Sequence, residues 1–273
     1  MIKIFLSVRN RLAITTKCIT ALQRHSKLEH QIYVYDNLTN HKVDEHFMYW
    51  SILYKKGIVK QVTFNTPEST FNAFSKAVAF NQFGKLHEED PNKSKYTFLL
   101  ILDNDIIVTP GWDETLQKAW QEVVRYGLTN IKVIGQSPGG IRAKVEYQHK
   151  IAGHRAFLGK LGGSAFWSIK PDFFKDVGYL EVKELTGRSK GHDQKYWIKL
   201  DKSSGGKEYI LGIVSNLAIH CGKMSGSICN SLSRDKNNLE KIKFEAVEEE
   251  INKLSFDDFY KKICKDPELV KDW

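Results

Sequence analysis

The segment FLLILDNDIIV, residues 98–108, decides how the rest of the chain is interpreted. Its apolar first half has the length and composition of a strand that is buried on both faces. Two carboxylates follow, Asp103 and Asp105, with Asn104 between them. Neighbouring carboxylates repel one another and lose hydration when buried, unless a cation joins them. The segment therefore predicts either a cation site at the tip of a core strand or an ordinary turn, since Asp and Asn also favour turns.

Strand and helix patterns alternate along the chain around this run. Apolar, β-branched segments predict strands, and apolar residues at helical spacing predict helices between them. The predicted strands of the first half are residues 2–8, 30–36, 58–64 and 96–102, and the predicted helices are residues 11–24, 71–83 and 112–126. This alternation predicts an α/β fold with a mixed, mostly parallel sheet that is flanked by helices.

The second half of the chain is less regular. Strand patterns recur near residues 131–135 and 162–169, and a third strand is expected to end at His220. Two amphipathic helices are predicted over residues 234–254 and 256–264. We expect the second of these to begin with a capping box formed by Ser255 and Asp258.

Polar side chains follow three of the predicted strands. Arg9 and Asn10 come after the first strand, Asp36 ends the second, and the aspartate pair comes after the strand over 96–102. Ligands of such sheets bind beyond the carboxyl ends of the strands. We therefore expect these side chains to converge on one site.

Composition limits the class of protein. The 273 residues are 41% hydrophobic, as in ordinary globular proteins. The N-terminal apolar stretch is too short for a signal-peptide core, and no run approaches the ~18 apolar residues of a membrane span, so a cytoplasmic protein is expected. The four cysteines are scattered and form no CxxC pair, which favours free thiols over disulfides or structural zinc.

The charge is strongly and unevenly basic. The chain carries a net charge of +9, and between residues 125 and 170 the only acidic residue is Glu146. The basic residues of that stretch are Arg125, Lys132, Arg142, Lys144, Lys150, Arg155, Lys160 and Lys170. Such a stretch suits an anionic partner, such as nucleotide phosphates, nucleic acid or an acidic membrane face, but it is equally typical of a solvated basic surface.

The order of the motifs resembles that of the GT-A-fold nucleotide-sugar glycosyltransferases, most closely the inverting family 2-like group. The motifs are SVRN at the first strand tip, VYDN at the second, NAFSKAVAFN in a helix, DND after the buried strand, and GHDQKYWIKL with AIHCG further on. The resemblance covers residues 1–225. It implies a GT-A catalytic domain there, with a nucleotide-binding part over about 1–110 and an acceptor part over about 111–225. A C-terminal helical extension would follow over residues 226–273.

The resemblance also implies roles for individual residues. Residues implied to bind the donor are Ser7, Val8, Arg9, Asn10, Asp36, Asn72, Lys76, Asp103 and Asn104. Residues implied to bind Mn²⁺ or Mg²⁺ are Asp105, His220 and Asp103. Asp193 would be the catalytic base, in a His192–Asp193 pair where the family usually has two acids. Simpler interpretations remain open, because Asp193 also suits a helix N-cap and His220 a buried or capping histidine.

The implied reaction is a single displacement with inversion. A sugar would move from a nucleotide-diphosphate sugar, with UDP-sugar favoured, to a hydroxyl acceptor. The basic stretch would suit a polyanionic acceptor such as hydroxymethylated DNA or an acidic polysaccharide; lipid-linked and protein acceptors also remain open. One alternative is a sugar-phosphate nucleotidyltransferase, although SVRNRLAITTK has no Gly-rich loop. Another is a non-enzymatic nucleic-acid-binding protein, although no reader motif is present.

Overall fold

The computed structural model describes seven segments of the chain. They are residues 1–37, 42–65, 76–136, 149–160, 165–180, 192–221 and 238–265. At several segment ends only the backbone is described, as at Lys76, His192 and Asp193. The predicted donor-binding residue Asn72 lies outside the described residues.

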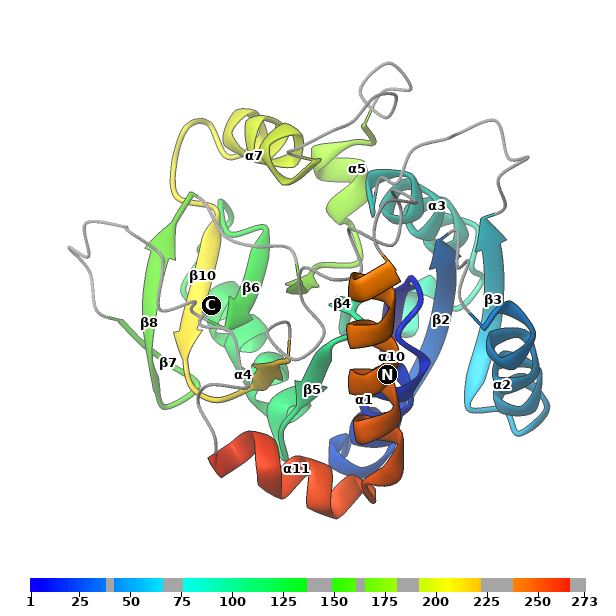
Figure 1. The fold of residues 1–273 in the computed structure, drawn as a ribbon. Helices are drawn as coiled ribbons and strands as arrows, with labels where there is room; N and C mark the ends of the chain where they lie inside the picture. Colours follow the sequence, from blue (N-terminus) through cyan, green and yellow to red (C-terminus); the bar gives the residue numbers. More distant parts are fainter. Residues whose placement is uncertain are drawn as a thin grey trace.

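A sheet of nine strands forms the centre of the molecule (Figure 1). The strands are β1 (Ile2–Val8), β2 (His30–Asn37), β3 (Val59–Asn65), β4 (Phe98–Asp103), β6 (Val133–Gln136), β7 (His149–Ile151), β8 (His154–Gly159), β9 (Phe166–Ile169) and β10 (Ile210–Val214). They lie in the order β3-β2-β1-β4-β9-β6-β10-β8-β7. The first four are parallel, β9 is antiparallel to β4 and β6, and β8 is antiparallel to β10 and β7. The mixed, mostly parallel sheet predicted from the sequence is confirmed.

Helices cover both faces of the sheet and enclose two apolar clusters. One cluster includes side chains of α1 (Leu12–His25), α2 (Val43–Lys55), α4 (Trp112–Arg125), α10 (Asn238–Lys253) and α11 (Phe256–Lys265). The other includes side chains of α3 (Lys76–Glu88), α5 (Phe173–Val177) and α7 (His192–Ser203). Along β4, Leu100 and Leu102 belong to the first cluster and Ile101 to the second, because successive side chains of a strand point to opposite faces. Burial on both faces is why this strand is apolar throughout.

Helix α2 was not among the elements predicted from the sequence. It buries Trp50 and Leu53 but exposes Val43, Phe47 and Met48. Apolar side chains on both the buried and the exposed sides obscure the helical period on which a sequence prediction depends. In Figure 1 this helix lies beside β3, at the opposite end of the sheet from β7 and β8.

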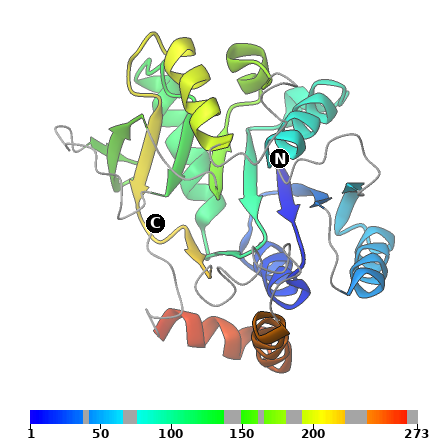
Figure 2. The same cartoon turned by 45° about the horizontal axis from the view of Figure 1, so that its top comes forward.

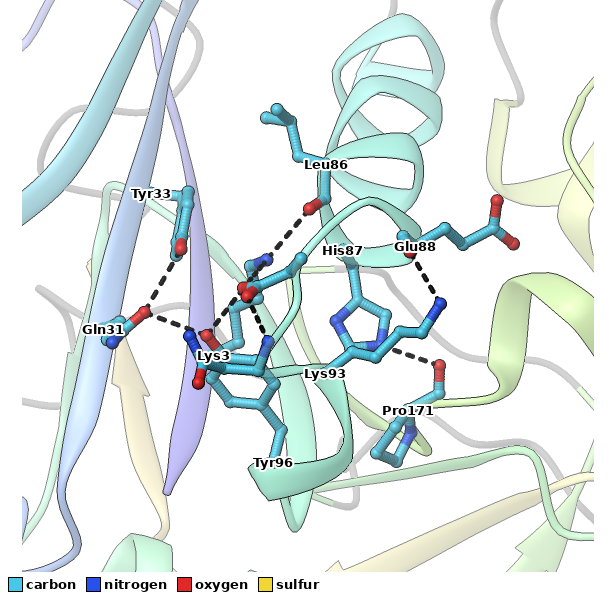
Figure 3. A network of polar contacts seen from close by, with 11 residues as sticks. Lys3, Gln31, Tyr33, Leu86, His87, Glu88, Lys93, Tyr96 and Pro171 are labelled. Atoms are coloured by element: carbon cyan, nitrogen blue, oxygen red, sulfur yellow. Dashed lines mark hydrogen bonds and ion pairs between the residues drawn. The ribbon is translucent and has the colours of Figure 1, made fainter.

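A closed polar network lies at the amino end of β1 (Figure 3). Lys3 Nζ donates to Asp90 Oδ2 at 2.8 Å and to the Leu86 carbonyl at 3.2 Å. The Tyr96 hydroxyl lies 2.8 Å from the same Asp90 oxygen and 2.9 Å from Gln31 Oε1. Lys3 also lies over the Tyr33 ring, 4.4 Å from its centroid. The ammonium of this fully buried lysine thus has a carboxylate, a carbonyl and an aromatic ring as partners, as burial of a charge requires.

The two C-terminal helices pack against α1, as Figures 1 and 2 show. Ile251 of α10 and Phe259 of α11 are fully buried in the same cluster as the side chains of α1. The Lys17 ammonium donates to the carbonyl of Leu254, at the turn between α10 and α11. The N-cap half of the predicted capping box is confirmed, since the Asp258 N–H donates to Ser255 Oγ at 3.1 Å. The Asp258 carboxylate accepts a bond of 2.6 Å from the Ser255 hydroxyl instead of from its backbone N–H.

The helices have the lengths and patterns of globular helices. In α4, for example, Leu116 and Trp120 are buried whereas Val124 is exposed. Crossing a bilayer takes about 20 consecutive apolar residues. No helix within the described ranges is long and apolar enough to do so.

Candidate functional site

Three neighbouring strands bring predicted site residues to one edge of the sheet. β1 lies between β2 and β4, with Val8 opposite Asp36 and Ser7 opposite Asp103. The chain winds outward from β1 in both directions, so the crevice beyond β1 and β4 is a topological switch point. In open α/β sheets, ligands bind at such points, outside the carboxyl ends of the strands.

The loop from β1 to α1 has an unusual backbone. Asn10 and Arg11 both adopt left-handed conformations, with φ of 53° and 58°. Each non-glycine residue in this region costs roughly 1–2 kcal/mol, so surrounding contacts must hold the loop. The Thr15 hydroxyl and N–H both donate to the Arg11 carbonyl, at 2.7 and 3.0 Å. These two hydrogen bonds hold the left-handed backbone conformation at Arg11.

Asn104 holds the same loop from the tip of β4. Its amide nitrogen donates to Thr15 Oγ1 at 2.8 Å and lies 3.4 Å from the Asn10 carbonyl. The side chain is buried, so its amide nitrogen links the aspartate segment to the loop after β1. The donor-binding role predicted for Asn104 stays a prediction, with this structural role beside it.

Asp105 lies at the centre of the site. Its Oδ2 atom is 2.6 Å from Arg11 Nη1 and 3.5 Å from His220 Nε2. A small antiparallel ribbon of β5 (Ile106–Val108) and β11 (Ala218–His220) places the histidine there, with His220 opposite Ile106. The ribbon is extended by the Cys221 N–H, which donates to the Asp105 carbonyl at 2.8 Å. Backbone pairing therefore holds Asp105 and His220 together, although they are 115 residues apart in the sequence.

The electrostatics of the site keep Asp105 ionised. Burial alone would raise the pKa of this carboxyl, because it disfavours the charged form. Hydrogen bonding to His220 and the nearby Arg11 guanidinium act in the opposite direction and prevail. Together they hold the pKa of Asp105 well below its usual range, so its negative charge persists at any physiological pH.

The two side-chain atoms that meet here, a carboxylate oxygen and an imidazole nitrogen, are of kinds that bind divalent metal ions. Two protein ligands bonded to one ion at ~2.1 Å lie about 3 to 3.5 Å apart, and the Asp105 and His220 atoms match this spacing. Within the described ranges, no three His, Cys, Asp or Glu side chains meet as a complete metal site. Asp105 and His220 would thus supply two ligands. The remaining positions would be left for water and substrate oxygens, as is common for Mg²⁺.

Asp36, at the tip of β2, is held by the helix that follows it. Trp50 Nε1 donates to Asp36 Oδ2 at 3.1 Å, and His46 Nδ1 lies 3.4 Å from the same oxygen. All three side chains are buried, so α2 fixes the orientation of this carboxylate. Sequence analysis identified Asp36 but not its two partners.

The other predicted residues are placed to different degrees. Val8 is buried, whereas Ser7, Arg9 and Asp103 are partly exposed near the strand tips. Lys76 is the first residue of α3, and Asp193 is the second residue of α7. Their backbones are described but their side chains are not, so their predicted roles stay predictions. A helix start at the His192–Asp193 pair agrees with the sequence pattern.

Two functional candidates were missed by the sequence analysis. Arg11, the partner of Asp105, immediately follows the SVRN motif. Glu248 of α10 is buried, and its Oε2 accepts a hydrogen bond of 2.9 Å from the N–H of Ala13, in the first turn of α1. The only sequence signal for Arg11 is its proximity to the motif, and nothing in the sequence connects Glu248 with α1.

Comparison with known proteins identifies the fold. No protein-family model matches the chain, and no curated protein matches its sequence. Among solved structures, GalNAc-T7 with UDP, GalNAc and Mn²⁺ is similar over 98% of this chain and 59% of that one, with 12% identity and a TM-score of 0.53. The mannosyltransferase PcManGT from Pyrobaculum calidifontis, with GDP-Man and Mn²⁺, is similar over 92% and 69%, with 10% identity and a TM-score of 0.51. TarS of S. aureus is similar over 89% of this chain and 41% of that one, with 13% identity and a TM-score of 0.50.

These likenesses concern the fold. The chain has the α/β architecture of the GT-A nucleotide-sugar glycosyltransferases, as the sequence resemblance implied. It spans between two fifths and about two thirds of the length of the three proteins.

Proposed function

We propose that this protein is a glycosyltransferase that takes a sugar from a nucleotide-diphosphate sugar with the help of a divalent cation. The observation that carries the proposal is the meeting of Asp105 with His220 at the switch point of a GT-A fold. A buried carboxylate that is kept ionised suits Mn²⁺ or Mg²⁺, and an imidazole nitrogen 3.5 Å from its oxygen adds a ligand of the kind that transition metals accept. PcManGT and GalNAc-T7, which share the fold, were solved with Mn²⁺ and a nucleotide.

The donor would lie along the tips of the central strands. Asp36 would recognise the nucleoside, because α2 holds its carboxylate rigidly at the tip of β2. The residues from Ser7 to Asn10, with Asp103, would contact the ribose and phosphates at the neighbouring tips. UDP is the favoured nucleotide, and the sugar remains to be identified.

The chemistry would divide between the two sides of the sugar. The cation bound by Asp105 and His220, with Asp103 nearby, would offset the negative charge of the departing diphosphate. Asp193, at the start of α7, would accept the proton of the acceptor hydroxyl as its oxygen attacks the anomeric carbon. Attack from the face opposite the leaving group inverts the anomeric configuration.

The acceptor would approach from the side of the second half of the sheet. Arg155 on β8 is exposed there, whereas Arg142 and Lys144 lie outside the described residues. A basic surface would favour a polyanionic acceptor, such as hydroxymethylated DNA or an acidic polysaccharide. We further propose that residues 1–225 carry the catalytic site and that 226–273 act as a helical extension.

A panel of nucleotide-sugars with Mn²⁺ tests the proposal. We expect one donor to bind and to be hydrolysed slowly when no acceptor is present. Asp193→Asn should bind this donor as the wild type does, but its turnover should fall by about 10²–10⁴-fold. Asp201→Asn is the matched control, because Asp201 lies on the same helix and pairs only with Lys160 among the contacts described at its carboxylate. Failure of every nucleotide-sugar to bind would refute the proposal, and full turnover by Asp193→Asn would remove this residue as the base.

A further inference from the structure

The guanidinium of Arg11 occupies the oxygen that a metal ion would need. Arg11 Nη1 lies 2.6 Å from Asp105 Oδ2, the same atom that lies 3.5 Å from His220 Nε2. An ion bonded to Asp105 Oδ2 and His220 Nε2 would bring a second positive charge against the guanidinium. Arginine and metal therefore compete for a single carboxylate oxygen.

We propose that Arg11 is an exchangeable counter-ion of Asp105, which a divalent cation displaces and which then binds the donor diphosphate. The inference rests on the proposed function and adds a residue and a coupling to it. It predicts that metal and diphosphate bind cooperatively, because the arrival of one creates the place for the other.

The contacts of Arg11 favour such an exchange. Its backbone is fixed by Thr15, while its side chain is 16% exposed and so reaches solvent. The guanidinium contributes nothing to the hydrogen bonds between Asn104, Thr15 and the loop carbonyls. These bonds would therefore remain in place when the side chain leaves Asp105.

A displaced guanidinium would lie where a diphosphate needs it. Arg11 stands between the tip of β1 and the first turn of α1, and the planar fork of arginine matches phosphate oxygens. Helix N-termini often bind phosphates themselves, but here the Ala13 N–H is already bonded to Glu248. A buried carboxylate at that position repels an anion. The positive charge for the diphosphate would thus come from the ion and from arginine side chains, Arg11 among them, and not from the start of the helix.

Calorimetric titration of the 273-residue protein tests the exchange, with Mn²⁺ alone as the first probe and UDP in saturating Mn²⁺ as the second. Arg11→Gln removes the competing charge and keeps hydrogen-bonding groups. We expect it to bind Mn²⁺ alone about tenfold more tightly than the wild type, and UDP about tenfold more weakly, in the usual range of coupling between two ligands. Arg11→Lys, which keeps a cation, should bind Mn²⁺ as the wild type does.

A matched control is available at the other end of α1. Arg24 also pairs with an aspartate, Asp257, at 2.7 Å, but on the exposed surface. Arg24→Gln should leave both affinities unchanged. Mn²⁺ binding that is equal or weaker in Arg11→Gln, or UDP binding that is unchanged, overturns the inference while the proposed function stands. A wild-type protein that binds neither Mn²⁺ nor UDP would refute both.

Discussion

Strand β1 has a buried ion pair near each of its ends, and the two pairs differ in how completely they are enclosed. At the amino end, Lys3 and Asp90 are 2.8 Å apart, with side chains 0% and 9% exposed. At the carboxyl end, Arg11 and Asp105 are 2.6 Å apart, with side chains 16% and 8% exposed. The distances are similar, but the lysine of the first pair is fully buried, whereas the arginine of the second reaches solvent. We call Lys3–Asp90 the closed pair and Arg11–Asp105 the open pair.

The partners around each pair explain the difference. Asp90 accepts bonds from Lys3 and the Asn92 N–H and lies against the Tyr96 hydroxyl, all within one network (Figure 3). Asp105 instead shares one oxygen between Arg11 and His220, just beyond the carboxyl end of β4. A closed pair specifies and stabilises structure, whereas a pair with a second ligand nearby and access to water is suited to exchange. The same interaction can thus serve the fold at one end of a strand and a ligand at the other.

Loss of the closed pair should have the largest effect on stability. Lys3→Met leaves Asp90 buried without its cation, which costs about 3–5 kcal/mol in the free energy of unfolding. Denaturant unfolding measures this loss, and Lys3→Met combined with Asp90→Leu should recover part of it. Arg24→Met, at an exposed pair, should cost less than about 1 kcal/mol. A loss of similar size in Lys3→Met and Arg24→Met would contradict the distinction.

Acid should weaken the closed pair over a defined range of pH. Burial alone would raise the pKa of Asp90, but hydrogen bonds from Lys3, Asn92 and Tyr96 lower it to about 2, against 3.8 ordinarily. A lowered folded-state pKa gives stability that is present above pH 3.8 and is lost as the pH falls toward 2. The contribution is on the order of 2 kcal/mol. Unfolding measured from pH 5 to pH 2 should show this decline in the wild type, and Lys3→Met should show a flatter one.

Loss of the open pair should cost less and should be repaired by metal. Arg11→Gln leaves Asp105 with His220 and with an amide that can still donate a hydrogen bond to it, so we expect a loss of about 1–2 kcal/mol. Added Mn²⁺ should raise the unfolding temperature of this variant more than that of the wild type. Mn²⁺ should raise the unfolding temperature of Lys3→Met by the same amount as that of the wild type. A larger increase in Lys3→Met would show that the metal acts at a site other than Asp105.

We expect the smallest effect on stability from Glu248, whose carboxylate joins α10 to the first turn of α1 through the N–H of Ala13. Burial raises the pKa of this carboxyl, so its charge is poorly stabilised. Glu248→Gln can keep the contact with the Ala13 N–H and should change the free energy of unfolding by less than about 0.5 kcal/mol, whereas Glu248→Ala should lose about 1 kcal/mol with this cap. Equal losses in the two variants would show that the hydrogen bond is unimportant.

The sequence predicted the parts of the fold that depend on local patterns. Residues 2–8 could be recognised as a strand because they are rich in β-forming residues that weakly alternate, and residues 98–102 because their apolar residues are continuous. Ser255 could be recognised as a cap because its partner is three residues away. The two ion pairs could not be predicted, since Lys3 and Asp90 are 87 residues apart and Arg11 and Asp105 are 94 apart.

The candidate site was predictable in outline for the same reason. Polar residues at the ends of parallel strands must converge, which brought Asp36 and Asp105 into consideration. The direction in which a side chain points within a turn is not encoded in its spacing. Asn104 therefore could not be recognised as a residue that holds the loop, nor Arg11 as the partner of Asp105.

One measurement tests the central claim, which is that Asp105 binds a cation for a nucleotide donor. UDP is titrated calorimetrically in the presence of Mn²⁺ into the wild type, Asp105→Asn and Asp90→Asn, at a temperature where all three are folded. Each variant neutralises one aspartate of a buried ion pair, near opposite ends of β1. We predict that Asp105→Asn loses UDP affinity by at least about tenfold, the usual effect of removing a charged contact, while Asp90→Asn binds as the wild type does. Equal UDP affinity in all three proteins would contradict the account.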